Sequence, residues 1–315
     1  MKVVIAFAIV YIVWGSTYFF IMLSVQHIPP MLVGMLRYLV AGALMLGWCL
    51  IRREPLFAKG VIGPAFVSGF FLLCGGNGIL IWSEQYVPSS LAAVLLASGP
   101  IWFVVLDRRQ WGVNFRSKST LVGLVVGFIG VLLLFWERLR PGGVVASNGS
   151  GAAGAAAGTH SQVTVALVIL ILASISWAGG SLYSKYRSAP VANSVNAGWQ
   201  MMLAGLVFLV ASVVSGELAD FHFKTVPLSS WLAIAYLVTM GSLAGYSAFV
   251  WLLQVRPATQ VSTHAYVNPV VAVLLGVFFA GESLSPMQLT GLAVILTSVL
   301  LINLAKYRGK ILMSK

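Results

Sequence analysis

Long apolar stretches separated by short polar breaks run along the whole chain. Each stretch approaches the roughly 20 residues that an α-helix needs to cross the hydrocarbon core of a bilayer. Prolines and pairs of arginines mark the breaks, as expected at the ends of helices. The pattern predicts ten transmembrane helices, at residues 3–25, 31–51, 61–82, 89–107, 120–136, 164–185, 194–215, 229–252, 259–280 and 286–305.

The pattern of the first half returns in the second half. Four residues recur 169 positions later: Trp82, Gln85, Pro88 and Pro100 return as Trp251, Gln254, Pro257 and Pro269. Two more recur at offsets of 163 and 168: Trp14 as Trp177, and Gly123 as Gly291. Each copy holds five predicted helices, and an odd number inserts the second copy upside down. We therefore expect an all-α membrane protein of ten transmembrane helices, built as two inverted five-helix repeats with a site where they meet.

The two repeats are expected at residues 1–136 and 164–315, the second ending in a basic cytoplasmic tail. Between them, Gly, Ala and Ser fill 15 of the 27 positions from 137 to 163. A stretch of this composition has no apolar face on which to fold. It predicts a flexible linker on the outer side of the membrane.

The composition indicates that much of the protein surface is in contact with lipid and not with water. The chain is 59% hydrophobic and 8% charged, with a mean hydropathy of +0.96, whereas soluble domains carry about 25% charged residues. The partner of this surface is therefore the lipid bilayer. The formal charge of +12 does not indicate nucleic acid, because no basic stripe with interleaved aromatics is present. No residue spacing suggests a metal site or a cofactor.

The basic residues instead orient the helices. If the N-terminus is cytoplasmic, 15 of the 19 Lys and Arg residues fall in cytoplasmic segments and three in outer loops. The remaining one, Arg37, lies inside a helix. Because cytoplasmic loops carry the excess of Lys and Arg, we expect both termini to be cytoplasmic in a multi-pass membrane protein.

Arg37 is the clearest candidate for chemistry, since charged groups inside the membrane are costly and tend to line cavities or form pairs. It lies roughly 9 Å along the second helix, at ~1.5 Å per residue. One interpretation is that it snorkels outward or pairs with Glu84. The other is that it attracts a substrate carboxylate. Its repeat equivalent, 163 positions later, is Gln200, and a long polar side chain at both points favours a cavity.

Two glycine-rich segments add further polar candidates. Asn77 follows Gly75 and Gly76, and its repeat equivalent Tyr246 follows Gly245. Glycines let helices or a ligand approach the backbone closely, so these segments predict either tight helix packing or cavity walls.

Proline interrupts two helices at equivalent positions. Pro100 and Pro269 each remove a backbone hydrogen bond, and paired broken helices point to a transport site. The alternative is a structural kink. Near the second proline lie His264, Tyr266 and Asn268.

Three residues are candidates for proton coupling. His264 is one of them because histidine as a residue type titrates near neutral pH; a hydrogen-bonded structural role is the alternative. Glu84 and Glu282 lie near the outer ends of helices three and nine, where an exposed helix end is the alternative interpretation.

Aromatic residues are dense in the predicted helices. Trp14 and Trp177 are repeat-related and mid-helix, so they are expected either to wall a substrate cavity or to pack the core. The other candidate wall residues are Tyr18, Trp82 and Tyr266.

These residues resemble a known family. The resemblance is carried by residues 14–19, 84–100, 176–178 and 265–272 and by Gly281-Glu282 followed by Gly291. The chain is similar to EamA-type transporters, the ten-helix members of the drug/metabolite transporter superfamily. The resemblance implies two five-helix halves, a central cavity and alternating access; members move amino acids, purines, aromatic compounds or drugs, mostly outward. The chain departs from the pattern after helix four, where Asp107-Arg108-Arg109 replaces Gly-Glu, and in its long linker.

The sequence thus predicts an inner-membrane exporter of a small metabolite, such as an amino acid, an aromatic or a drug-like compound. Either proton exchange or the substrate gradient drives it. Alternatives are a passive facilitator or uptake carrier and a lipid flippase. An intramembrane enzyme is disfavoured, because the seven acids are scattered and no nucleophile with its base is recognisable.

Overall fold

The computed structural model describes residues 1–87, 89–136, 160–280 and 285–313, and every regular element in these ranges is helical. In the first half the long spans are α1 (Lys2–Val25), α2 (Pro30–Ile51), α3 (Ile62–Gly69) continued by η1 (Phe70–Gly78) and α4 (Ile79–Ser83), α5 (Ser89–Leu96) with α6 (Gly99–Leu106), and α8 (Lys118–Leu134). The short η2 (Arg108–Gln110) and α7 (Trp111–Asn114) precede α8.

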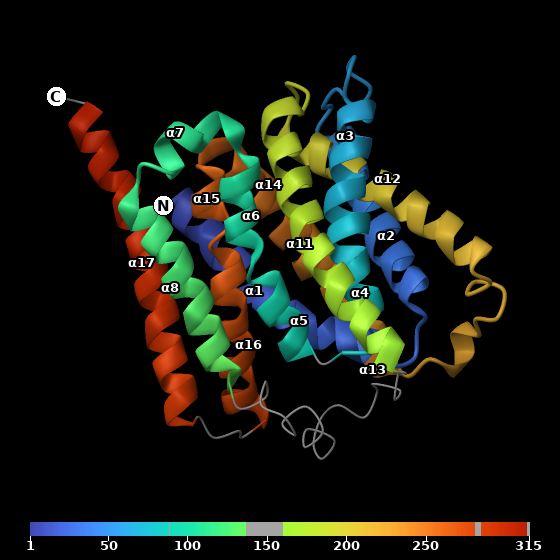
Figure 1. Ribbon diagram of the computed structural model, residues 1–315. Coiled ribbons are helices and arrows are strands. Elements are labelled where there is room, and N and C mark those ends of the chain that lie inside the picture. Colours follow the sequence, from blue (N-terminus) through green and yellow to red (C-terminus); the bar gives the residue numbers. More distant parts are fainter. Residues whose placement is uncertain (88, 137–159, 281–284, 314–315) are drawn as a thin grey trace.

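The second half repeats this order. Its spans are α11 (His160–Arg187), α12 (Asn193–Val214), α13 (Leu228–Tyr236) continued by η5 (Leu237–Tyr246) and α14 (Ser247–Val255), α15 (Ala258–Val261) with α16 (His264–Ala280), and α17 (Pro286–Met313). The short η4 (Phe223–Thr225) precedes α13. These spans correspond one to one with the ten predicted helices, so the predicted ten-helix fold is confirmed (Figure 1).

Two bounds differ from the prediction. The helix α11 begins at His160, inside the predicted linker, because residues 160–163 contain neither glycine nor proline to stop it. The helix α17 continues to Met313, through the basic tail. The rest of the predicted linker and Glu282 lie outside the described residues.

Length and hydropathy agree with a membrane protein. Among the described residues, six spans are long and apolar enough to cross a bilayer. A seventh candidate joins Arg108–Asn114 to Lys118–Leu134 across a bend of 100°, and shorter apolar helices occupy Ala92–Leu106 and Pro286–Ile302.

The two halves are related by reciprocal contacts between α2 and α12. A Cβ atom on Gly42 would lie 2.6 Å from the backbone nitrogen of Met202. A Cβ atom on Gly205 would likewise lie 2.6 Å from the backbone nitrogen of Leu39. Gly205 lies 163 residues after Gly42, and Met202 lies 163 residues after Leu39. Exchanging the halves therefore maps one contact onto the other. The same reciprocity relates α8 and α17 through the pairs Gly123–Ile302 and Gly291–Leu134.

Two π-helical segments lie at equivalent positions in the centre of the bundle. The segments η1 and η5 overlap when the first is shifted by 169 residues. Such i→i+5 turns are rare and occur mostly at functional sites. The helix α11 packs on η1, and α1 packs on η5, so each central helix of one half lies against the π-helical segment of the other.

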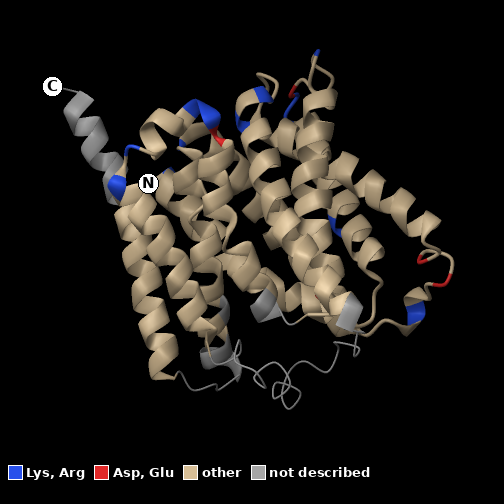
Figure 2. Ribbon diagram, in the orientation of Figure 1, with Lys and Arg blue, Asp and Glu red and all other residues tan. Residues whose placement is uncertain are grey.

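Charge divides the two ends of the bundle. Lys and Arg gather at the end where α3 begins and α11 ends, which we call the basic end (Figure 2). Its described basic residues include Arg52, Lys59, Arg108, Arg109 and Arg187. The opposite end is the one where α2 begins.

Candidate functional site

A cavity of about 80 Å³ lies between the two halves. This space admits a few water molecules, each of which needs roughly 10–15 Å³. Eight of the predicted site residues line it: Trp14, Tyr18, Arg37, Asn77, Trp177, Tyr246, His264 and Asn268. As substrate contacts they stay predictions, but the fold does bring them together.

Arg37 is held in the cavity wall by neutral groups. Its side chain is only 3% exposed. Its Nε donates to Ser242 Oγ at 2.9 Å, and its Nη1 donates to Asn77 Oδ1 at 3.0 Å. The guanidinium carbon also lies 5.0 Å from the centre of the Tyr38 ring, within the range of a cation–π contact. Arg37 therefore neither snorkels out nor pairs with Glu84, as one interpretation of the sequence had it.

The repeat equivalents of this pair form a second polar contact. Tyr246 donates its hydroxyl to Gln200 Oε1 at 2.8 Å, as Arg37 donates to Asn77 in the other half. The Gln200 amide nitrogen donates to Ser68 Oγ at 2.8 Å and to Ser184 Oγ at 3.1 Å. Gln200 is completely buried behind Tyr246 and does not line the cavity. It therefore acts through Tyr246, while Arg37 faces the cavity directly.

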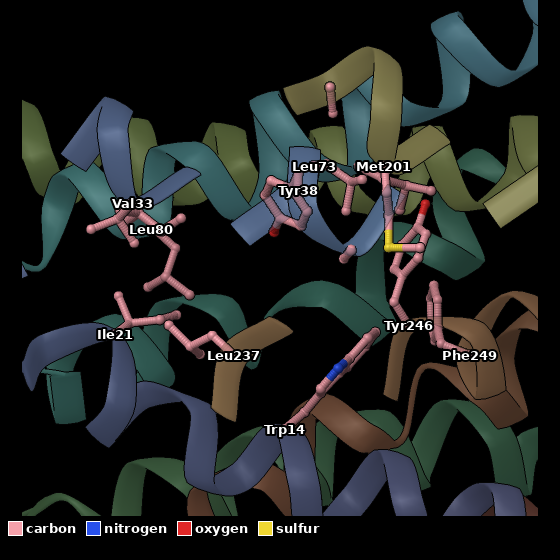
Figure 3. Packing of buried hydrophobic residues seen from close by; sticks show 14 of the residues in the cluster. Trp14, Ile21, Val33, Tyr38, Leu73, Leu80, Met201, Leu237, Tyr246 and Phe249 are labelled. Atoms are coloured by element: carbon pink, nitrogen blue, oxygen red, sulfur yellow. The ribbon is translucent and has the colours of Figure 1, made fainter. Parts of the chain in front are cut away.

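Four rings from four helices form an aromatic cluster, which consists of Trp14, Trp177, Phe249 and His264. The Trp14 ring lies 5.3 Å from Trp177, 4.9 Å from Phe249 and 5.2 Å from His264, between centroids. Phe249 lies 5.3 Å from both Trp177 and His264. Figure 3 shows the Trp14 side chain extending from α1 towards Tyr246 and Phe249. Aromatic pairs at these distances add roughly 0.5–1.5 kcal/mol each beyond their area burial, so the cluster is a firm wall.

Four buried apolar side chains form a second group, apart from the aromatic cluster. Ile21, Val33, Leu80 and Leu237 are all buried, and Figure 3 shows them grouped together and apart from the Trp14 ring. Of these four, Leu80 lines the cavity, as do Trp14, Trp177 and His264 of the aromatic cluster, so the cavity adjoins both groups.

Two polar residues near the second proline complete the wall. His264 has its Nδ1 2.9 Å from the carbonyl oxygen of Val261. Because a carbonyl only accepts, Nδ1 carries the proton, and Nε2 of a neutral ring is left as an acceptor. Asn268 contributes a buried Oδ1 with no hydrogen-bond partner among the described residues.

Three predicted site residues lie elsewhere or have another role. Tyr266 points away from the cavity and donates its hydroxyl to the Leu124 carbonyl of α8 at 2.8 Å. Trp82 packs on Tyr86, with ring centroids 4.7 Å apart, and does not line the cavity. Glu84 is only 5% exposed, so the interpretation of an exposed helix end is wrong for it. The reason is that the end of α4 is buried in the bundle.

The two predicted proline sites differ. Helix α5 ends at Leu96 and α6 begins at Gly99, so this span is broken directly before Pro100. Helix α16 runs through Pro269 without interruption, and the break in that span lies earlier, at Ser262 and Thr263.

Sequence reasoning missed several lining or contacting residues. Ser242, which fixes Arg37, has Leu73 as its repeat equivalent, so a search for polar residues in both halves does not find it. Thr17, Tyr38 and Ser174 also line the cavity. Their proximity to Trp14, Arg37 and Trp177 in the sequence is the signal that could have identified them.

The arrangement suits an anionic group bound beside an aromatic wall. Arg37 brings a positive charge, and no Asp or Glu is among the residues that line the cavity. No group of three or more potential metal ligands occurs in the described part of the chain.

Comparison with known proteins agrees with this architecture. The sequence profile of the EamA-like transporter family matches residues 1–136 and 164–304. The chain is 37% identical to the "Uncharacterized inner membrane transporter YedA" of Escherichia coli K12, over 94% of this chain and 89% of that protein. It is 29% identical to "Protein PecM" of Dickeya dadantii, over 92% and 89%. It is 25% identical to the "Probable amino-acid metabolite efflux pump" of Salmonella typhimurium, over 95% and 94%.

A solved crystal structure has the same fold. It superposes with a TM-score of 0.72 over 96% of this chain and 98% of that one, at 18% sequence identity. The family match, the transporter relatives and the apolar helices identify a multi-pass transporter of the inner membrane, and the names of the relatives point away from an enzyme. The chain belongs to the EamA-like transporter family.

Proposed function

We propose that this transporter exports a small amphipathic metabolite that carries a carboxylate, by alternating access of the central cavity to the two sides of the membrane. The observation that carries the proposal is Arg37, which is buried in the cavity wall with only neutral hydrogen-bond partners. A buried charge without a counter-ion is costly. A substrate carboxylate would supply that counter-ion, in the bidentate geometry that a guanidinium favours.

The rest of the wall supports an amphipathic substrate. Trp14 and Trp177 offer apolar ring surface, while Asn77, Tyr246, His264 and Asn268 offer polar groups. The name of the Salmonella typhimurium relative, "Probable amino-acid metabolite efflux pump", supports both this class of substrate and the outward direction. Proton coupling would fall to His264, the one imidazole among the residues that line the cavity.

The distribution of charge supports cytoplasmic termini. The basic end would face the cytoplasm, because cytoplasmic loops are enriched in Lys and Arg. Both α1, which begins with Lys2, and α17, which ends with a basic tail, would then have their charged ends inside.

The test is thermal stabilisation of the purified protein by a panel of amino acids, aromatic carboxylates, purines and aromatic cations. A ligand at 100 times its Kd stabilises by about 2.7 kcal/mol. We expect stabilisation by carboxylates. Removing one partner of a buried charge pair costs roughly 2–5 kcal/mol, so Arg37→Met should weaken binding at least about 30-fold.

The matched control is Arg52→Met, the same substitution at an exposed arginine of the basic end. It should leave ligand affinity unchanged. Stabilisation by cations only, or equal carboxylate affinity in wild type and Arg37→Met, would contradict the proposal.

A further inference from the structure

The indole N–H groups of Trp14 and Trp177 are in different states, although the two residues are repeat equivalents. Trp14 Nε1 donates to the carbonyl oxygen of Gly241 at 3.0 Å. Trp177 Nε1 is buried and has no hydrogen-bond partner among the described residues. Buried N–H groups are nearly always paired in native proteins, so an unpaired one calls for an explanation.

The two rings lie on equivalent backbone positions. A Cβ atom on Gly245 would lie 2.6 Å from Trp14 Nε1, and one on Gly76 would lie 2.8 Å from Trp177 Cε3. Gly76 and Gly245 are themselves 169 residues apart, so each indole lies on the equivalent glycine of the π-helical segment in the opposite half. The backbones therefore correspond, while the indoles differ in the ring edge that faces the glycine and in the hydrogen bond of the N–H group.

The missing acceptor can be named from the repeat. The residue 169 positions before Gly241 is Leu72, which lies in η1 beside Trp177's helix. A Cβ atom on Gly180 would lie 2.9 Å from the backbone nitrogen of Leu72. The equivalent contact in the other half joins Gly241 to Thr17, where a Cβ atom on Gly241 would lie 3.3 Å from Thr17 Cγ2. The Leu72 carbonyl is thus the counterpart of the acceptor that Trp14 uses.

In an inverted-repeat carrier, alternating access is largely a rocking of one repeat against the other around the fixed site. If the equivalent repeats exchange roles in that movement, each contact of this state has its repeat-related counterpart in the opposite-facing state. We propose that Trp14 and Trp177 are a pair of positioning residues that alternate: in this state Trp14 bonds to Gly241, and in the opposite-facing state Trp177 bonds to Leu72 while Trp14 is released. The inference rests on the alternating access proposed above. The two indoles are in direct contact, with centroids 5.3 Å apart, so a shift of one ring is transmitted to the other.

This exchange predicts that Trp14→Phe and Trp177→Phe shift the ratio of the two conformational states in opposite directions. Trp14→Phe removes a bond that only the present state makes, so it should favour the opposite state. Trp177→Phe removes an N–H that only the opposite state would satisfy, so it should favour the present one. From the ~0.5–1.5 kcal/mol net value of a hydrogen bond, each change should shift the ratio of states roughly two- to tenfold.

The ratio can be read with a cysteine at Ala173, which is buried and lines the cavity. In a background with Cys49→Ala and Cys74→Ala, Ala173→Cys is labelled with a membrane-impermeant maleimide, from outside in intact cells and from inside in inverted vesicles. The ratio of the two rates reports the ratio of states. The control is Trp199→Phe, which loses an indole bond of 2.8 Å to the Leu56 carbonyl outside the repeat-related pair.

We expect the labelling ratio to move in opposite directions in Trp14→Phe and Trp177→Phe, and to stay near wild type in Trp199→Phe. If the labelling ratio shifts in the same direction in both variants, or no more than in the control, the exchange of the two tryptophans is overturned. Labelling of the wild-type background from both sides would at the same time support alternating access. Labelling from one side only in wild type would overturn both. If a variant does not fold, 15N-indole resonances of the wild-type protein give the same test. The Trp14 and Trp177 signals should move in opposite directions between conditions that favour either side.

Discussion

The firmness of the aromatic cluster is tested by adding one methyl group beneath Trp14. In Gly245→Ala the new Cβ would lie 2.6 Å from Trp14 Nε1 and 2.9 Å from its Cδ1, where ordinary contacts begin at 3.4 Å. The indole would have to retreat by about 0.8 Å. Its retreat is blocked by Trp177, Phe249 and His264, which contact it on other sides.

The expected cost follows from these contacts. Overpacking a filled site costs roughly 1–3 kcal/mol, and displacing the indole weakens its bond to the Gly241 carbonyl, worth about 1 kcal/mol. Gly→Ala in a helix gains up to about 1 kcal/mol from backbone propensity. The chain offers a control for that gain: Gly179, in the middle of α11, has nothing within 4 Å of its would-be Cβ.

The assay compares thermal unfolding of both variants with wild type in one detergent. Gly179→Ala should be as stable as wild type or slightly more so. Gly245→Ala should fall below Gly179→Ala by about 2–4 kcal/mol, the overpacking and hydrogen-bond terms together. Equal midpoints for the two variants would refute the reasoning, because they would show that the Trp14 ring can move aside at no cost.

Four further predictions concern three residues away from the cavity. Tyr266→Phe loses the bond to Leu124, so it should lower stability by roughly 1 kcal/mol and leave ligand affinity unchanged; an affinity loss would return Tyr266 to the site. Glu217 accepts from the first amides of α2, so Glu217→Ala should destabilise by about 0.5–2 kcal/mol, and an unchanged midpoint would exclude a capping role. Burial raises the pKa of Glu217, so its protonation favours the fold: relative to Glu217→Gln, wild-type stability should be greatest below pH ~4.3 and decline as the pH rises through the folded pKa; the opposite slope would contradict this. Tyr186 donates to Asp107 across the two halves at the basic end, so Tyr186→Phe should speed maleimide labelling of a cavity cysteine from that end, and slower labelling would argue against a closing contact.

Much of the fold could be predicted because the lipid solvent leaves little choice. Apolar runs of helix length must form helices, since no other structure satisfies the backbone within a bilayer short of a closed barrel. The repeat then fixed which helices are equivalent, and the contacts of Gly42 and Gly205 bear this out. The π-helical segments could not be predicted, because an i→i+5 turn leaves no separate period in the pattern of apolar residues.

The site could be predicted only in part, for reasons of side-chain direction. The repeat placed Arg37 and Gln200 at equivalent points, yet only Arg37 lines the cavity, because Tyr246 is interposed before Gln200. His264 and Tyr266 are two residues apart, and such residues point to different faces of a helix. One therefore lines the cavity while the other packs against α8.

The central claim, that a carboxylate substrate moves through a cavity governed by Arg37, is tested most directly by transport in proteoliposomes. The ligand that stabilises the purified protein best would be measured as a radiolabelled flux against its concentration, in wild type, Arg37→Met and Arg52→Met. The account predicts a saturable flux that Arg52→Met retains and Arg37→Met loses. A flux that rises linearly without saturation, or one that Arg37→Met leaves unchanged, would contradict it.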